Sequence, residues 1–201
     1  MRDYPPPKSR PGGVNMSPVS LDSLARVLAV VAGLAVLMLL AGGSSESDAS
    51  KKSGCGKTRA AGKPSDTLRR PDARSAVRCL INQERSGRNL KPNDNLVKAA
   101  QRHSRYMYKH GCFAHQCAGE ASTVARIQNA GYMRGASSWR VGEVIALNRE
   151  NASPREIVRQ WKHSSGHRAQ ILSGGYEHLG VGMVARGGRA FYTVTLGARS
   201  G

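Results

Sequence analysis

The feature that most constrains this chain is an uncharged apolar run at residues 27–41, VLAVVAGLAVLMLLA. As a helix it would span about 23 Å, somewhat less than the roughly 30 Å hydrocarbon core of a bilayer. Four basic residues precede the run and AGGSS follows it; they are Arg2, Lys8, Arg10 and Arg26. This layout predicts either a cleaved secretory signal peptide or a single-pass transmembrane anchor. In both cases the basic end stays inside, so residues 44–201 are expected on the extracytoplasmic side.

The segment after the run, residues 44–72, is rich in Ser, Gly, Lys and Arg, and Leu68 is its one large aliphatic residue. Such a composition buries too little apolar surface to fold and predicts a flexible linker. We therefore expect a leader at 1–43, a linker at 44–72 and one folded domain at 73–201. That last stretch is long enough to build a single hydrophobic core.

The chain is strongly basic, with 31 Lys and Arg against 13 Asp and Glu and a formal net charge of +18. The cations are scattered, without the aromatic interleaving or fold signature of a nucleic-acid binder, so no nucleic-acid partner is expected. An anionic envelope polymer or lipid fits the charge better, and a merely solvated Arg-rich surface is the alternative. The membrane itself would be contacted through the apolar run. The sequence does not set the oligomeric state.

Four cysteines are present: Cys55, Cys79, Cys112 and Cys117. An even number outside the cytoplasm favours disulfides, for which three connectivities exist. The cluster Cys112-Phe-Ala-His-Gln-Cys117 lacks the two-residue spacing of structural zinc motifs, so we interpret it as disulfide-forming.

Apolar periodicity and capping signals predict helices within residues 73–88, 93–111, 121–132 and 153–165. Alternation predicts a strand at 138–148 and two further strands within 177–197, joined by a Gly-Gly turn. About four helices interleaved with a small antiparallel sheet make an α+β fold, a layered α-β-α sandwich. His103 falls on an apolar helix face and is expected to be a hydrogen-bonded core histidine. His163 is expected to be exposed.

Three residues from separate elements are candidates for chemistry: His115 after a helix end, Glu143 in a strand and His167 after a Gly. Two imidazoles and a carboxylate supply three ligands to a divalent metal such as zinc and leave a fourth position for water. The same trio also suits a general base with its orienting acid. Alternatively, it forms a buried hydrogen-bonded network that only supports the fold. Spacing alone does not choose among these.

Eight motifs follow one another over about residues 76–198: CLINQER, FAHQ, RIQNAGY, VGEVIA, IVRQW, SSGHRAQIL, HLGVG and FYTVTLG. In this order they resemble the CAP superfamily (cysteine-rich secretory proteins, antigen 5 and pathogenesis-related 1), in its bacterial extracellular SCP-like form. The resemblance implies an α-β-α sandwich with two histidines and two acidic residues lining a central cleft, which in some members binds a divalent metal. Position by position, these residues match His115, Glu120, Glu143 and His167.

The chain departs from the family pattern at two positions. Val144 stands where Asn usually follows the acid, which predicts the loss of a polar side chain beside Glu143. Ser165 replaces a Pro before the second histidine. Family members are known for lipid and sterol binding, which implies a binding module for a small amphiphilic ligand or an envelope component. The alternative is a divalent-metal-dependent hydrolase of peptide or cell-wall polymer.

Overall fold

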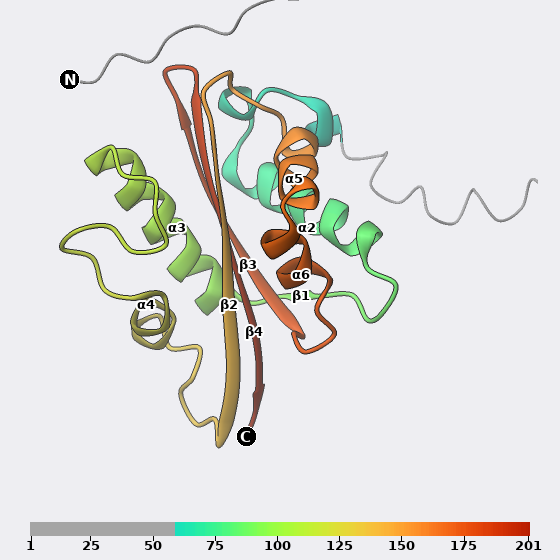
Figure 1. The fold of residues 1–201 in the computed structure, drawn as a ribbon, viewed down its shortest axis with the longest axis vertical. Helices are drawn as coiled ribbons and strands as arrows, with labels where there is room; N and C mark the ends of the chain where they lie inside the picture. The colour runs from blue at the N-terminus through green and yellow to red at the C-terminus, as the bar shows by residue number, and fades with distance from the viewer. Residues whose placement is uncertain (1–58) are drawn as a thin grey trace, which may run out of the picture. The chain divides into compact units, whose positions relative to one another are not determined.

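A computed structural model describes residues 59–201 of the chain as a mixed four-stranded sheet between two helical layers (Figure 1). The strand order is β1-β3-β4-β2, where β1 is parallel to β3 and the other pairs are antiparallel. The strands are β1 (Lys91–Pro92), β2 (Ser138–Asn148), β3 (His178–Arg186) and β4 (Arg189–Ser200). One face of the sheet is covered by α3 (Asp94–His110) and α4 (Thr123–Asn129). The other face is covered by α2 (Arg70–Glu84), α5 (Pro154–His163) and α6 (Ser165–Leu172).

The predicted α+β sandwich is confirmed, although the described residues hold five α-helices where four were expected. The last predicted segment corresponds to α5, and the extra helix is α6, which follows it directly: Ser164 is both the C-cap of α5 and the N-cap of α6. Gly166, directly before His167, lies in the first turn of α6. The sheet also gains the short parallel strand β1, which the sequence patterns did not indicate.

Local capping explains where α3 begins and ends and where α5 begins. The side chain of Asn93 accepts hydrogen bonds from the backbone of Asn95 and Leu96, and Gly111 ends α3 in the left-handed conformation with φ of 64°. Ser153 and Glu156 form a complete capping box at the start of α5. Each device satisfies backbone groups that a helix end leaves unpaired.

Helix α3 lies unusually close to the sheet because two glycines of β3 face its backbone. A Cβ on Gly180 would collide with the backbone of Leu96 and Val97, and one on Gly182 would collide with the backbone of Ala100. Side chains of β2 alternate between the two layers, as expected for a strand. Val144 packs in the core beneath α2 and α5, whereas Ile145 packs with Met107 under α3.

The structure differs from the predicted linker over residues 59–72. This stretch forms two 3-10 turns, η3 (Arg59–Gly62) and η4 (Ser65–Thr67), and the start of α2. Ala61 and Ser65 are buried, and the Ser65 hydroxyl lies 2.7 Å from that of Tyr192. Small residues thus dock on a core that the rest of the chain provides, which the low apolar content of this segment did not indicate.

The predicted leader, residues 1–43, and the remainder of the predicted linker, residues 44–58, lie outside the described residues. Within residues 59–201, no helix is both long enough and apolar enough to cross a bilayer.

Candidate functional site

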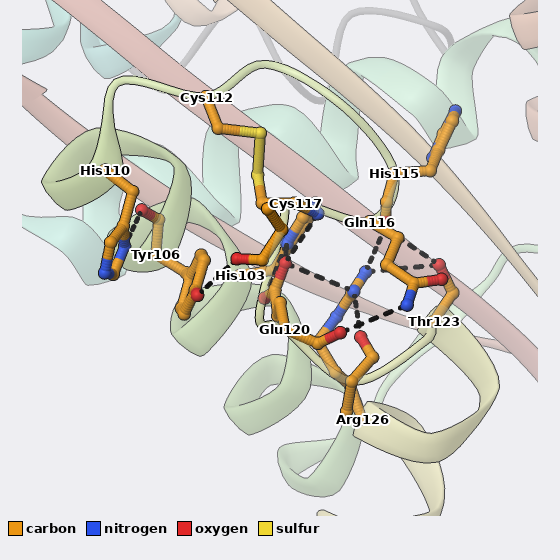
Figure 2. Close-up of a disulfide and its surroundings, with 12 residues drawn as sticks. His103, Tyr106, His110, Cys112, His115, Gln116, Cys117, Glu120, Thr123 and Arg126 are labelled. Atoms are coloured by element: carbon orange, nitrogen blue, oxygen red, sulfur yellow. Dashed lines mark hydrogen bonds and ion pairs between the residues drawn. A yellow bond between two sulfur atoms is a disulfide. The ribbon is translucent and has the colours of Figure 1, made fainter.

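Three of the candidate residues, His115, Glu120 and Glu143, come together on the α3 side of the sheet, where a disulfide-closed loop follows that helix, and the fourth, His167, approaches them from α6. Cys112 and Cys117 are bonded to each other, which selects one of the connectivities that the sequence left open, and Cys79 is also disulfide-bonded. Cys55 lies outside the described residues. Figure 2 shows this loop beside the carboxylate of Glu120, with His103 and Arg126 close to it and His115 projecting from the loop.

Glu143 is buried beneath the loop and accepts hydrogen bonds from several groups at once. Arg126 Nη2 donates to both carboxylate oxygens, at 3.0 Å to Oε1 and 2.8 Å to Oε2. Thr123 Oγ1 lies 3.2 Å from Oε1, and His115 Nδ1 lies 3.0 Å from the same oxygen. Both oxygens of Glu143 are therefore committed to neighbours within the protein.

Glu120 completes a closed group of four side chains. Its two oxygens lie 2.9 and 3.0 Å from His103 Nδ1, and Oε2 lies 3.5 Å from Arg126 Nη1. The other ring nitrogen of His103 faces Glu143 Oε1 at 3.8 Å and has no hydrogen-bond partner. We call His103, Glu120, Arg126 and Glu143 the ion-pair cluster. Their side chains are at most 7% exposed.

The cluster keeps Glu143 ionised. Burial alone would raise the pKa of this carboxyl, because a low-dielectric surrounding disfavours charge. The hydrogen bond from His115 and the electrostatic interactions with Arg126 and His103 outweigh burial, so the pKa lies below its ordinary value. A carboxylate held in this way is a poor proton acceptor, because it has already been stabilised in the charged form.

His115 and His167 face each other above the cluster and are the accessible part of the site. Their ring centroids are 6.5 Å apart, and the side chain of His115 is 53% exposed. Partial burial, together with the nearby His115, lowers the pKa of His167. Both imidazoles are thus available to a ligand from solvent.

The residues fit a metal centre only in part. Two coordinating imidazoles around one zinc ion place their ring centroids roughly 5–6 Å apart, close to the separation of His115 and His167. The third expected ligand, Glu143, already holds Arg126 through both oxygens. Among residues 59–201, no group of three or more His, Cys, Asp or Glu side chains is arranged to hold a metal ion. A metal would have to displace the guanidinium of Arg126 before Glu143 could become its ligand.

Sequence reasoning placed some of these residues correctly and missed others. His103 is the hydrogen-bonded core histidine that was expected, and His163 is exposed. The departure at Val144 does not remove a partner from Glu143, because successive strand residues point to opposite faces and Val144 lies in the opposite core. Arg126 was not singled out, and only its place in the RIQNAGY motif could have drawn attention to it.

Comparisons with known proteins agree with this fold. The family model described as "CAP: Cysteine-rich secretory protein family" matches residues 74–196. An uncharacterised Bacillus subtilis protein, YkwD, is 34% identical over 111 residues, which are 54% of this chain and 41% of that protein. The chain therefore spans less than half the length of this curated relative.

Two solved structures resemble the fold. An extracellular SCP-domain protein from Bacillus anthracis superposes with a TM-score of 0.55 and 24% identity, over 63% of this chain and 40% of that one. An outer surface protein from Borrelia burgdorferi gives a TM-score of 0.51 and 17% identity, over 63% of this chain and 89% of that one. The family match covers most of the chain, and the α-β-α sandwich agrees with it, so this chain belongs to the CAP family of cysteine-rich secretory proteins.

Proposed function

We propose that this chain is an exported or membrane-anchored CAP domain that acts outside the cytoplasm as a non-catalytic binding module for a small amphiphilic ligand. Its extracytoplasmic place is supported by the N-terminal apolar run. It is also supported by the two solved relatives, of which one is an extracellular protein and the other an outer surface protein. The ligand would contact the His115–His167 pair.

The observation that carries this proposal is the state of the two acidic residues. Glu143 and Glu120 are buried and paired with Arg126 and His103, so neither has a free oxygen for a general base or a metal. The ion-pair cluster therefore supports the His115–His167 pair from below. What remains accessible is a pair of imidazoles, which bind polar head groups by hydrogen bonding.

Exposed apolar side chains in the disulfide-closed loop and in α4 favour an amphiphile over a purely polar ligand. Phe113, two residues before His115, is 47% exposed, and Val124 is 41% exposed. Val124 follows Thr123, whose hydroxyl hydrogen-bonds Glu143. Large exposed apolar side chains next to convergent polar groups are typical of small-molecule sites.

Titration of the full chain with dansyl-labelled undecanoic acid tests the proposal through a saturable rise in dansyl fluorescence. We expect His115→Ala and Phe113→Ser each to weaken binding by about fivefold or more. The first variant loses a contact to the polar head group of the ligand, and the second loses a contact to its apolar part. His163→Ala changes an exposed histidine on α5 and serves as the matched control. Wild-type affinity in both site variants would contradict this site.

Calorimetric titration of zinc distinguishes the alternative, a metal-dependent hydrolase. We expect no binding at micromolar zinc, because Arg126 occupies the carboxylate that a third ligand requires. Micromolar binding that disappears in His167→Ala would contradict the proposal and favour the hydrolase.

A further inference from the structure

The outer face of α3 carries four cations in a row, Lys98, Arg102, Arg105 and Lys109, which we call the basic stripe. All four are exposed. Their spacing of four, three and four residues places them on one side of the helix, because residues three and four apart are neighbours. At a rise of 1.5 Å per residue the stripe is about 16 Å long.

The stripe is unfavourable for the helix that carries it. Like charges three and four residues apart destabilise a helix, and within α3 the one acidic residue, Asp94, lies four residues before Lys98 and offsets only that end of the stripe. None of the ion pairs among residues 59–201 includes any of the four side chains. Lys109 gains from the helix dipole because it lies in the last turn, but Lys98, Arg102 and Arg105 do not. An external anion would supply the missing counter-charge.

A groove beside the stripe extends the positive surface onto neighbouring elements. It has a volume of about 350 Å³ and is lined by Arg70 at the start of α2, Arg105 of the stripe and Arg186 at the end of β3. Asp66 is the acidic residue in its lining, and Tyr108 also lines it. Guanidinium groups bind phosphate in a bidentate manner, so three of them around one hollow favour a phosphate-bearing ligand.

From this arrangement we propose that the basic stripe and its groove bind a linear phosphodiester polymer of the cell envelope. A row of cations about 5–6 Å apart suits a chain of repeating phosphates, which can follow the helix and place one charge in the groove. A flat bilayer suits it less well, because the groove is concave. In addition, the exposed large apolar residues of the described chain, Phe113, Val124 and Trp139, lie outside α3.

The test measures binding of fluorescein-labelled linear polyphosphate to the full chain by fluorescence anisotropy at several salt concentrations. We expect the double variant Arg102→Gln/Arg105→Gln to bind at least tenfold more weakly. Its plot of log K against log salt should be shallower by about 2, one for each lost phosphate contact. The matched control is Arg155→Gln/Arg159→Gln, which removes the same charge from exposed positions on α5, and we expect a change below threefold.

Several outcomes would overturn this inference. Equal weakening in both double variants would show that only the net charge of +18 attracts the polymer. Competition by orthophosphate at the same phosphate concentration would show a single-anion site. Tighter binding to phosphatidylglycerol vesicles, lost in the stripe variant, would assign the surface to lipid. His115→Ala should leave polyphosphate binding unchanged, so failure of the polymer site is separate from failure of the proposed amphiphile site.

Discussion

At the scale of single residues, the ion-pair cluster is held together by mutual neutralisation. Removing two carboxylates from water costs several kcal/mol each unless opposite charges and hydrogen bonds replace the lost hydration. Arg126 faces both Glu120 and Glu143. His103 lies between the same two carboxylates, with one ring nitrogen facing each of them. The loop that presents His115 is thereby fixed to α3, α4 and β2 at once.

Acid should weaken the ion-pair cluster by protonating Glu143. The folded-state pKa of Glu143 lies below its ordinary value of 4.5, so the unfolded chain binds this proton more readily. The stabilisation that ionised Glu143 provides is complete at pH values above its ordinary pKa. It is lost as the pH falls through the folded-state pKa. Between about pH 5 and pH 3, we expect the free energy of unfolding to fall more steeply in wild type than in Glu143→Gln. Urea unfolding monitored by circular dichroism checks this, and parallel slopes in the two proteins would refute it.

The sequence predicts the burial of some residues of the ion-pair cluster but not of others. His103 recurs at helical spacing with Leu96, Ala99 and Ala100, so its burial follows from local periodicity. Arg126 lies in a seven-residue helix whose pattern is too short to define a buried face. Its burial depends on Glu120 and Glu143, which come from other elements, and such tertiary pairing leaves no local signal.

At the scale of elements, the contact between α3 and β3 sets the position of the site. Gly180 and Gly182 let the helix backbone approach the sheet, and His103, Glu120 and Glu143 meet only because α3 lies this close. A larger residue at either glycine has nowhere to go, since the obstructing atoms are backbone.

Gly182→Ala should therefore destabilise the fold by at least about 3 kcal/mol, at the upper end of the range for overpacking. The comparison is Gly87→Ala, at an exposed glycine whose added Cβ would meet nothing within 4 Å. We expect that change to stay within about 0.5 kcal/mol. Urea denaturation midpoints of the two variants decide the matter. A Gly182→Ala protein as stable as wild type would mean that the helix can move away from the sheet freely.

The elements themselves could largely be predicted, because caps and periodicity are local. The capping box at Ser153 and the Gly187-Gly188 turn define their helix and hairpin from a few residues. Strand β1 could not be predicted, since it contains two residues, one of them Pro92, and exists only through its pairing with β3. Helix α6 was not predicted either, because it is only eight residues long and carries Gly166 in its first turn.

At the scale of the whole molecule, the folded unit extends N-terminally beyond the segment that composition indicates. Ala61 is buried and Leu68 packs against the main core. The hydroxyl of Ser65 contacts both the Ala152 carbonyl and the hydroxyl of Tyr192. Burial raises the pKa of Tyr192 to about 12, as expected for a phenol sealed from water. Residues 59–69 thus close one end of the core and do not act as a spacer.

Replacing residues 59–69 of the full chain with an equally long Gly-Ser sequence tests this boundary. We expect the free energy of unfolding to fall by about 2–4 kcal/mol, from the lost burial of Ala61 and Leu68 and the lost hydrogen bonds of Ser65. The same replacement at residues 44–54, inside the predicted linker, keeps Cys55 in place and should leave stability unchanged. Chemical denaturation of both proteins separates the two cases. If the first replacement is as harmless as the second, the domain begins where composition placed it, at residue 73, and the contacts of Ser65 add nothing to the fold.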